Sequence, residues 1–132
     1  MSFDRFVGLP WLDRGRDGGG VDCWGLLALV YAAHGMSVPS YAGSYASAEH
    51  RAEVASLIAG ALPASWQPIA AGDERALDAV LMREGRIARH VAVVTRPGLL
   101  LHVSEGATSR IESYRTGLLR HRVVGFYRLR AP

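Results

Sequence analysis

The change in hydrophobic pattern near Leu77 is the feature that most constrains the fold of this chain. Before it, apolar residues recur at helical spacing, first from Cys23 and then in a stretch that Ser47 caps and Pro63 ends. After it, short apolar runs typical of strands cover residues 79–83, 90–95, 99–105, 109–114 and 123–130. Helical segments followed by strands indicate an α+β fold, with N-terminal helices packed on an antiparallel sheet of about five strands.

The length and composition are those of one compact domain spanning residues 1–132. The chain has 132 residues, 49% of them hydrophobic, without a break in composition that would separate two domains. It has no apolar run near the roughly 18 residues of a membrane span, and residues 1–10 lack the pattern of a secretory signal. We therefore expect synthesis in the cytoplasm without a signal peptide, and no insertion into a membrane.

The charge is unevenly distributed along the chain. All 15 basic side chains are arginines, and ten of them follow residue 82, against three glutamates in the same part. These arginines alternate with core residues along the expected strands and match no nucleic-acid motif, so we interpret them as a solvated sheet face and expect no nucleic-acid partner. The run Gly18-Gly19-Gly20 lacks the Gly-Lys-Ser/Thr ending of a phosphate loop, which argues against nucleotide binding. We expect no cofactor.

Cys23 is the only cysteine, so the chain cannot form an internal disulfide. It follows Asp22, a favourable N-cap, and begins a helical stretch that Gly35 ends. The unpaired N–H groups of a first helical turn stabilise a thiolate, so this position predicts a lowered thiol pKa and a nucleophilic role. The alternative is that Cys23 is a small buried apolar residue, which is the commoner use of a single cysteine.

A cysteine nucleophile needs a base, and two of the five histidines lie in otherwise apolar strands: His90 and His102. If residues 96–98 form a three-residue hairpin loop, Thr95 pairs with Leu99 and Ala92 lies opposite His102. His90 then shares a face with His102, at a diagonal distance of roughly 7 Å between backbones, so that the two rings can meet. His102 is therefore the expected partner that orients His90, with Ser104 and Glu105 as weaker substitutes.

Two other arrangements are weighed against this one. A Cys-His-Asn triad is impossible, because the chain contains no asparagine and its only glutamine is Gln67, in a proline-flanked segment expected to be a loop. One cysteine and two histidines are also legitimate zinc ligands. However, zinc sites usually include a short ligand pair such as C-x-x-C, which is missing here, so we predict no metal site.

The motif residues resemble those of the NlpC-type cell-wall peptidases, which are papain-like cysteine peptidases. Their Asp-Cys-Ser-Gly signature, strand histidine and third polar residue correspond, in order, to segments 22–26, 90–93 and 101–102. Segments 8–11, 15–17 and 38–41 are similar to the branch encoded with tail genes of phages and gene-transfer agents. The chain departs from the family pattern at Trp24, where serine is usual, and lacks the usual Pro-Gly-Asp before the first strand.

This resemblance implies a cysteine endopeptidase that hydrolyses peptidoglycan stem peptides, typically between γ-linked D-glutamate and the following diamino acid. Cys23 is then the nucleophile, His90 the acid and base, and His102 the orienting residue. Trp11, Asp22 and Trp24 are the candidate substrate-binding residues. The implied partners are stem peptides and the tip or hub proteins of a phage-like tail, which would carry the enzyme to the cell wall.

Two alternatives to the endopeptidase remain open. One is a structural component of tail assembly that keeps the papain-like shape with little or no turnover. The other is an amidase or acyltransferase that uses the same thiol.

Overall fold

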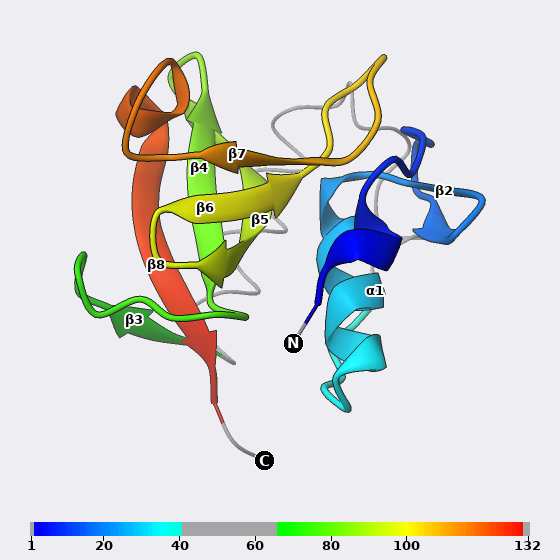
Figure 1. Cartoon of the computed structure of the whole chain (residues 1–132), viewed down its shortest axis with the longest axis horizontal. Coiled ribbons are helices and arrows are strands. Elements are labelled where there is room, and N and C mark those ends of the chain that lie inside the picture. Colours follow the sequence, from blue (N-terminus) through cyan, green and yellow to red (C-terminus); the bar gives the residue numbers. More distant parts are fainter. Residues whose placement is uncertain (1, 41–65, 131–132) are drawn as a thin grey trace.

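The structure, a computed structural model, describes residues 2–40 and 66–130. The elements in chain order are η1 (Asp4–Phe6), β1 (Arg16–Asp17), β2 (Gly20–Val21), α1 (Cys23–Ala33), β3 (Trp66–Ile69), β4 (Ala79–Glu84), β5 (Ile87–Arg96), β6 (Leu99–His102), β7 (Arg110–Ser113), η2 (Leu119–His121) and β8 (Val123–Leu129). The larger sheet has six strands. Figure 1 shows α1 beside this sheet. The predicted second helix, residues 47–61, lies outside the described residues.

The large sheet is antiparallel throughout, with strand order β3-β8-β4-β5-β6-β7. Strands β4 to β8 correspond to the five predicted runs, with bounds that differ by a few residues. The prediction of about five strands is nevertheless wrong by one, because β3 was interpreted as a loop. Pro68 lies inside β3, and an edge strand that pairs only with β8 tolerates a residue without an N–H group.

The hairpin between β5 and β6 has the predicted register but a different turn. Val93 pairs with Leu101 and Val94 with Leu100, as expected. The loop is one residue shorter than predicted, because Arg96 pairs with Leu99 around Pro97 and Gly98, and Gly98 has a φ of +97°. Thr95 is the extra residue of a bulge, and it restores the register that a three-residue loop would have given.

Helix α1 begins and ends where its sequence indicates. Asp22 caps it by accepting a hydrogen bond from the Gly25 N–H at 2.8 Å, and Gly35 follows it with a φ of +75°. The helix packs on β5 and on the β1–β2 hairpin. No helix in residues 2–40 and 66–130 is long and apolar enough to cross a membrane.

Apolar side chains are buried on both faces of the sheet. Along β5, Val91 and Val93 pack with α1 in one cluster, whereas Ala92 and Val94 belong to a second cluster on the opposite face. The second cluster also contains Tyr114, Leu119 and Phe126, from the last part of the chain. This double burial explains why residues 91–94 form a continuous apolar run instead of alternating with polar residues.

Candidate active site

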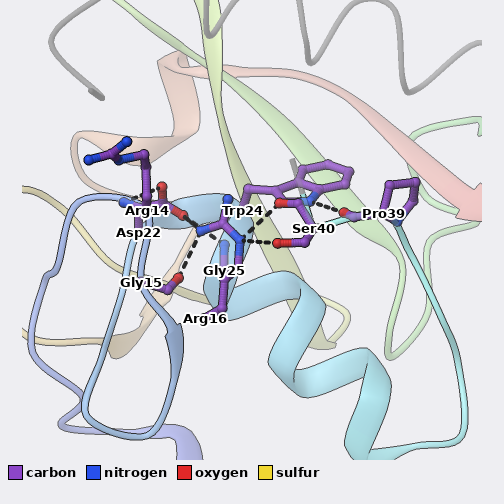
Figure 2. Close-up of polar contacts among 8 residues, drawn as sticks. All are labelled: Arg14, Gly15, Arg16, Asp22, Trp24, Gly25, Pro39 and Ser40. Atoms are coloured by element: carbon purple, nitrogen blue, oxygen red, sulfur yellow. Dashed lines mark hydrogen bonds and ion pairs between the residues drawn. The ribbon is translucent and has the colours of Figure 1, made fainter. Parts of the chain in front are cut away.

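The start of α1 is held by the carboxylate of Asp22, which is only 2% exposed. Its Oδ1 accepts hydrogen bonds from the Gly25 N–H and from Arg16 Nη1, the latter at 2.7 Å, and its Oδ2 accepts one from the Arg14 N–H at 3.1 Å (Figure 2). Both oxygens therefore bind groups of this chain. The predicted role of Asp22 in substrate binding stays a prediction.

Gly25 is required because the loop before the helix touches the first turn. A Cβ atom at Gly25 would lie 1.9 Å from the carbonyl oxygen of Gly15, and one at Gly15 would lie 2.2 Å from the carbonyl oxygen of Gly20. Two close backbone approaches thus stack the loop, the β1–β2 hairpin and the helix start on one another. This packing fixes the position of the residue that follows Asp22.

Cys23 is the first residue of α1 and is half-buried. Its side chain packs against the core cluster that contains Val91, and a backbone hydrogen bond at Val91 stabilises the thiolate. Burial, together with the negative charge of Asp22, nevertheless raises the pKa of Cys23 to about 12. The predicted lowering of the thiol pKa is therefore wrong for this structure: burial and a neighbouring carboxylate outweigh the helix terminus.

His90 and His102 meet on one face of the sheet, which confirms the predicted juxtaposition. His90 Nε2 lies 3.2 Å from His102 Nδ1, and the rings are edge to face, with centroids 5.4 Å apart. Both residues are buried, and burial is the main cause that lowers the pKa of each. The charge of each nearby arginine acts in the same direction. Both imidazoles are therefore neutral at pH 7.

Two carboxylates that the sequence analysis missed lie at the ends of this histidine pair. Glu112 makes a short contact with His102 Nε2, and Glu84 Oε1 lies 3.4 Å from His90 Nδ1. His102 pairs with Arg110 across β6 and β7, so Glu112, two residues further, lies diagonally opposite His102. The register of those two strands is the signal that identifies Glu112, and the sequence alone, which suggested Ser104 and Glu105, does not define it.

The thiol of Cys23 lies beside the strand that holds His90 but is not bonded to the imidazole. Cys23 lies against the backbone of Val91, the residue after His90, yet among the described residues no hydrogen bond joins its sulfur to His90. The Nδ1 atom of His90 faces Glu84 instead. The structure therefore brings His90 and His102 together and places Cys23 beside the strand that holds His90, without a hydrogen bond between the sulfur and the imidazole.

The two predicted aromatic contacts differ in their surroundings. Trp24 is 5% exposed, and its indole N–H donates to the carbonyl oxygen of Pro39 at 2.7 Å (Figure 2). Trp11 is half-buried, and its backbone N–H donates to the carbonyl oxygen of Ala107, in the loop after β6. Their roles toward a substrate stay predictions.

A zinc site would need several ligating side chains close together. In the two segments that the structure describes, no group of three or more His, Cys, Asp or Glu side chains is arranged to hold a metal ion.

A family model and three solved structures that match this chain all belong to the same protein family. A model of the NlpC/P60 family matches residues 8–128. An NLP/P60-family protein similar to lipoprotein, from Staphylococcus aureus subsp. aureus Mu50, superposes with a TM-score of 0.69 and 16% identity, over 100% of this chain and 43% of that one. An NlpC/P60-family protein from Bacillus cereus ATCC 10987 gives a TM-score of 0.70 and 20% identity, over 94% and 36% of the two chains.

A third solved structure is nearer in length. The NlpC/p60 domain of the peptidoglycan hydrolase SagA gives a TM-score of 0.60 and 18% identity, over 94% of this chain and 89% of that domain. This chain spans less than half of the staphylococcal and Bacillus proteins, and at these identities the likeness concerns the fold. No curated protein sequence matches the chain.

Proposed function

Because the chain belongs to the NlpC/P60 family, we propose that it is a cysteine endopeptidase that hydrolyses amide bonds in peptidoglycan stem peptides. The observation that carries the proposal is the position of Cys23 at the start of α1, against the strand that holds His90, with His90 in contact with His102. The peptidoglycan hydrolase SagA, whose NlpC/p60 domain has the same fold, supports this choice of substrate.

The reaction starts from a neutral thiol and a neutral imidazole, because burial raises the pKa of Cys23 and lowers that of His90. The sulfur attacks the scissile carbonyl carbon while His90 Nδ1 takes the thiol proton as a general base. This step requires the sulfur and Nδ1 to come within hydrogen-bond distance of each other, since catalytic hydrogen bonds often form only when substrate is bound. The backbone N–H of Cys23 is the expected donor to the oxyanion.

The remaining steps return the enzyme to its starting state. The His90 imidazolium gives its proton to the leaving amine nitrogen, the C–N bond breaks and a thioester to Cys23 remains. His90 then takes a proton from water, whose oxygen attacks the thioester carbon. The C–S bond breaks, a carboxylic acid leaves, and the sulfur recovers the proton from His90.

We further propose which amide bond is cleaved and in which assembly the protein acts. The bond is that between γ-linked D-glutamate and the diamino acid, and the domain is the papain-like peptidase of a phage-type tail tip. Segments 8–11 and 38–41, which resemble the tail-associated branch, support this setting. The partners are then tail-tip or hub proteins, and the protein acts on the cell wall as part of the particle.

Digestion of purified peptidoglycan sacculi tests the proposal. We expect the wild type to release fragments with new amine ends, and Cys23→Ala and His90→Ala to release none above background. Fragment masses identify the bond: a cut at an amide that links glycan to peptide would mean an amidase, and a transferred acyl group would mean an acyltransferase. Equal release by the wild type and by Cys23→Ala would refute a cysteine mechanism.

A structural tail component with little turnover is the second candidate. The raised thiol pKa and the absence of a sulfur–imidazole hydrogen bond between these two described residues favour it. It predicts that the wild type releases no fragments from sacculi, although the protein is folded and joins a tail assembly.

A further inference from the structure

Four side chains form a continuous row across β4, β5, β6 and β7. Glu84 Oε1 lies 3.4 Å from His90 Nδ1, His90 Nε2 lies 3.2 Å from His102 Nδ1, and His102 Nε2 touches Glu112 Oε2. Arg110 Nε donates to the same oxygen of Glu112 at 3.1 Å. The row therefore has a carboxylate at each end and two imidazoles in the middle.

A count of protons shows that the row cannot be hydrogen-bonded throughout at neutral pH. Its three contacts need three N–H donors, because ionised carboxylates only accept. Two neutral imidazoles carry one N–H each. One of the three contacts must therefore lack a proton. Which contact this is depends on whether an N–H of the histidine pair points to Glu112 or to Glu84.

The end at Glu112 is the stronger acceptor. His102 Nε2 and Glu112 Oε2 form a hydrogen bond, whereas His90 Nδ1 lies 3.4 Å from Glu84 Oε1 without forming one, and Arg110 holds the Glu112 carboxylate in place. Burial raises the pKa of Glu112, but the hydrogen bond from His102 and the positive charge of Arg110 act in the opposite direction, and the pKa is lowered overall. An ionised Glu112 takes the Nε2–H of His102, and His102 Nδ1 must then accept from the Nε2–H of His90.

This order leaves the lone pair of His90 on Nδ1. We propose that Glu112 is a positioning residue that fixes the tautomers of both histidines and so makes Nδ1 of His90 the basic nitrogen. Without Glu112 the opposite order becomes available, with an N–H on His90 Nδ1 that faces Glu84, and Nδ1 then has no lone pair that could accept a proton. The inference rests on the proposed function only for its catalytic consequence.

The test is ¹⁵N NMR of the histidine rings at neutral pH, with Glu112→Ala and Glu112→Gln compared with the wild type. Glu105→Gln is the matched control, because Glu105 is exposed, in the loop between β6 and β7. Backbone NMR chemical shifts and the midpoint of thermal unfolding establish that each variant folds. We expect the Glu112 variants to fold because this side chain is 39% exposed and lies on an edge strand.

In the wild type and in Glu105→Gln we expect both His90 and His102 as Nε2–H tautomers. In Glu112→Ala we expect His102 to lose this preference and His90 Nδ1 to become protonated in a large share of molecules. Glu112→Gln, whose amide oxygen still accepts, should keep the wild-type tautomers in part. An Nδ1–H tautomer of His102 in the wild type, or unchanged ring nitrogens in Glu112→Ala, would overturn the inference.

Turnover is the second readout. Loss of a residue that orients a catalytic histidine through another group lowers kcat by about 10- to 100-fold, with KM little changed, and Glu112→Gln should lie between the wild type and Glu112→Ala. If the wild type has no peptidase activity, the proposed function fails, but the tautomers still decide the role of Glu112. If the tautomers change as expected and kcat does not, Glu112 does not act in catalysis.

Discussion

The raised pKa of Cys23 has a measurable consequence for its reaction with iodoacetamide. At pH 7 a thiol with a pKa of about 12 is ionised in about one molecule in 10⁵, whereas a cysteine with a pKa of about 8.5 is ionised in about one in 30. A thiolate of higher pKa is intrinsically more nucleophilic, and a Brønsted slope of about 0.45 over this difference restores a factor of about 40. The folded protein should therefore react about a hundredfold more slowly than the unfolded one.

Alkylation rates followed by intact-protein mass spectrometry from pH 6 to pH 10 check this result. The thiol form dominates until the pH reaches the raised pKa, so the rate for the folded protein should rise about tenfold per pH unit through this window. The same protein in urea is the control, and its rate should level off above about pH 8.5. Limited access would lower the rate without changing this slope. A rate for the folded protein that levels off below pH 7 would refute the neutral thiol and indicate a preformed thiolate.

Three substitutions test the structure around the site. Gly25→Ala places a Cβ 1.9 Å from a backbone oxygen and should lower the free energy of unfolding by about 1–3 kcal/mol or more. Gly18→Ala is the control, because a Cβ there has nothing within 4 Å and should change this free energy little. Equal denaturation midpoints for the two variants would contradict the close approach at Gly25. Asp22→Ala removes a helix cap and the charged hydrogen bond from Arg16, so urea denaturation should show a loss of about 2–4 kcal/mol, and a loss under about 0.5 would be inconsistent with this role. Tyr114→Phe removes a hydrogen bond to Glu74 at 2.6 Å on the face away from α1, and should cost about 1–3 kcal/mol with unchanged kcat; a fall in kcat would place Tyr114 in the site.

Local patterns in the sequence were sufficient for the helix and for the histidine pair. Asp22 before Cys23 predicts the N-cap, and Gly35 predicts the end of the helix. The contact between His90 and His102 depends only on the parity of a short hairpin, so it survives the bulge at Thr95, which compensates for the shorter loop. The strand β3 was missed because a proline argues against a strand unless the strand is known to lie at the edge of a sheet.

The electrostatics of the site could not be predicted from the sequence, since they depend on tertiary burial. A helix terminus contributes about 0.3–1 kcal/mol, less than one pKa unit, whereas full burial shifts a pKa by up to about 3–5 units. Cys23 is half-buried, yet burial is the largest cause of its raised pKa, and its neighbour Asp22 adds to the effect. Glu112 was missed for a similar reason: its contact depends on the register of β6 and β7, which are joined by a loop that no short pattern defines.

Trapping of a covalent intermediate tests the central claim most directly. The wild-type protein is mixed with a synthetic stem peptide, quenched in acid within milliseconds to seconds, and weighed by intact-protein mass spectrometry. We predict an added mass equal to the acyl part of the peptide, on the peptide fragment that contains Cys23, and no such mass in Cys23→Ala. Cleavage of the stem peptide by Cys23→Ala at the wild-type rate would contradict the account.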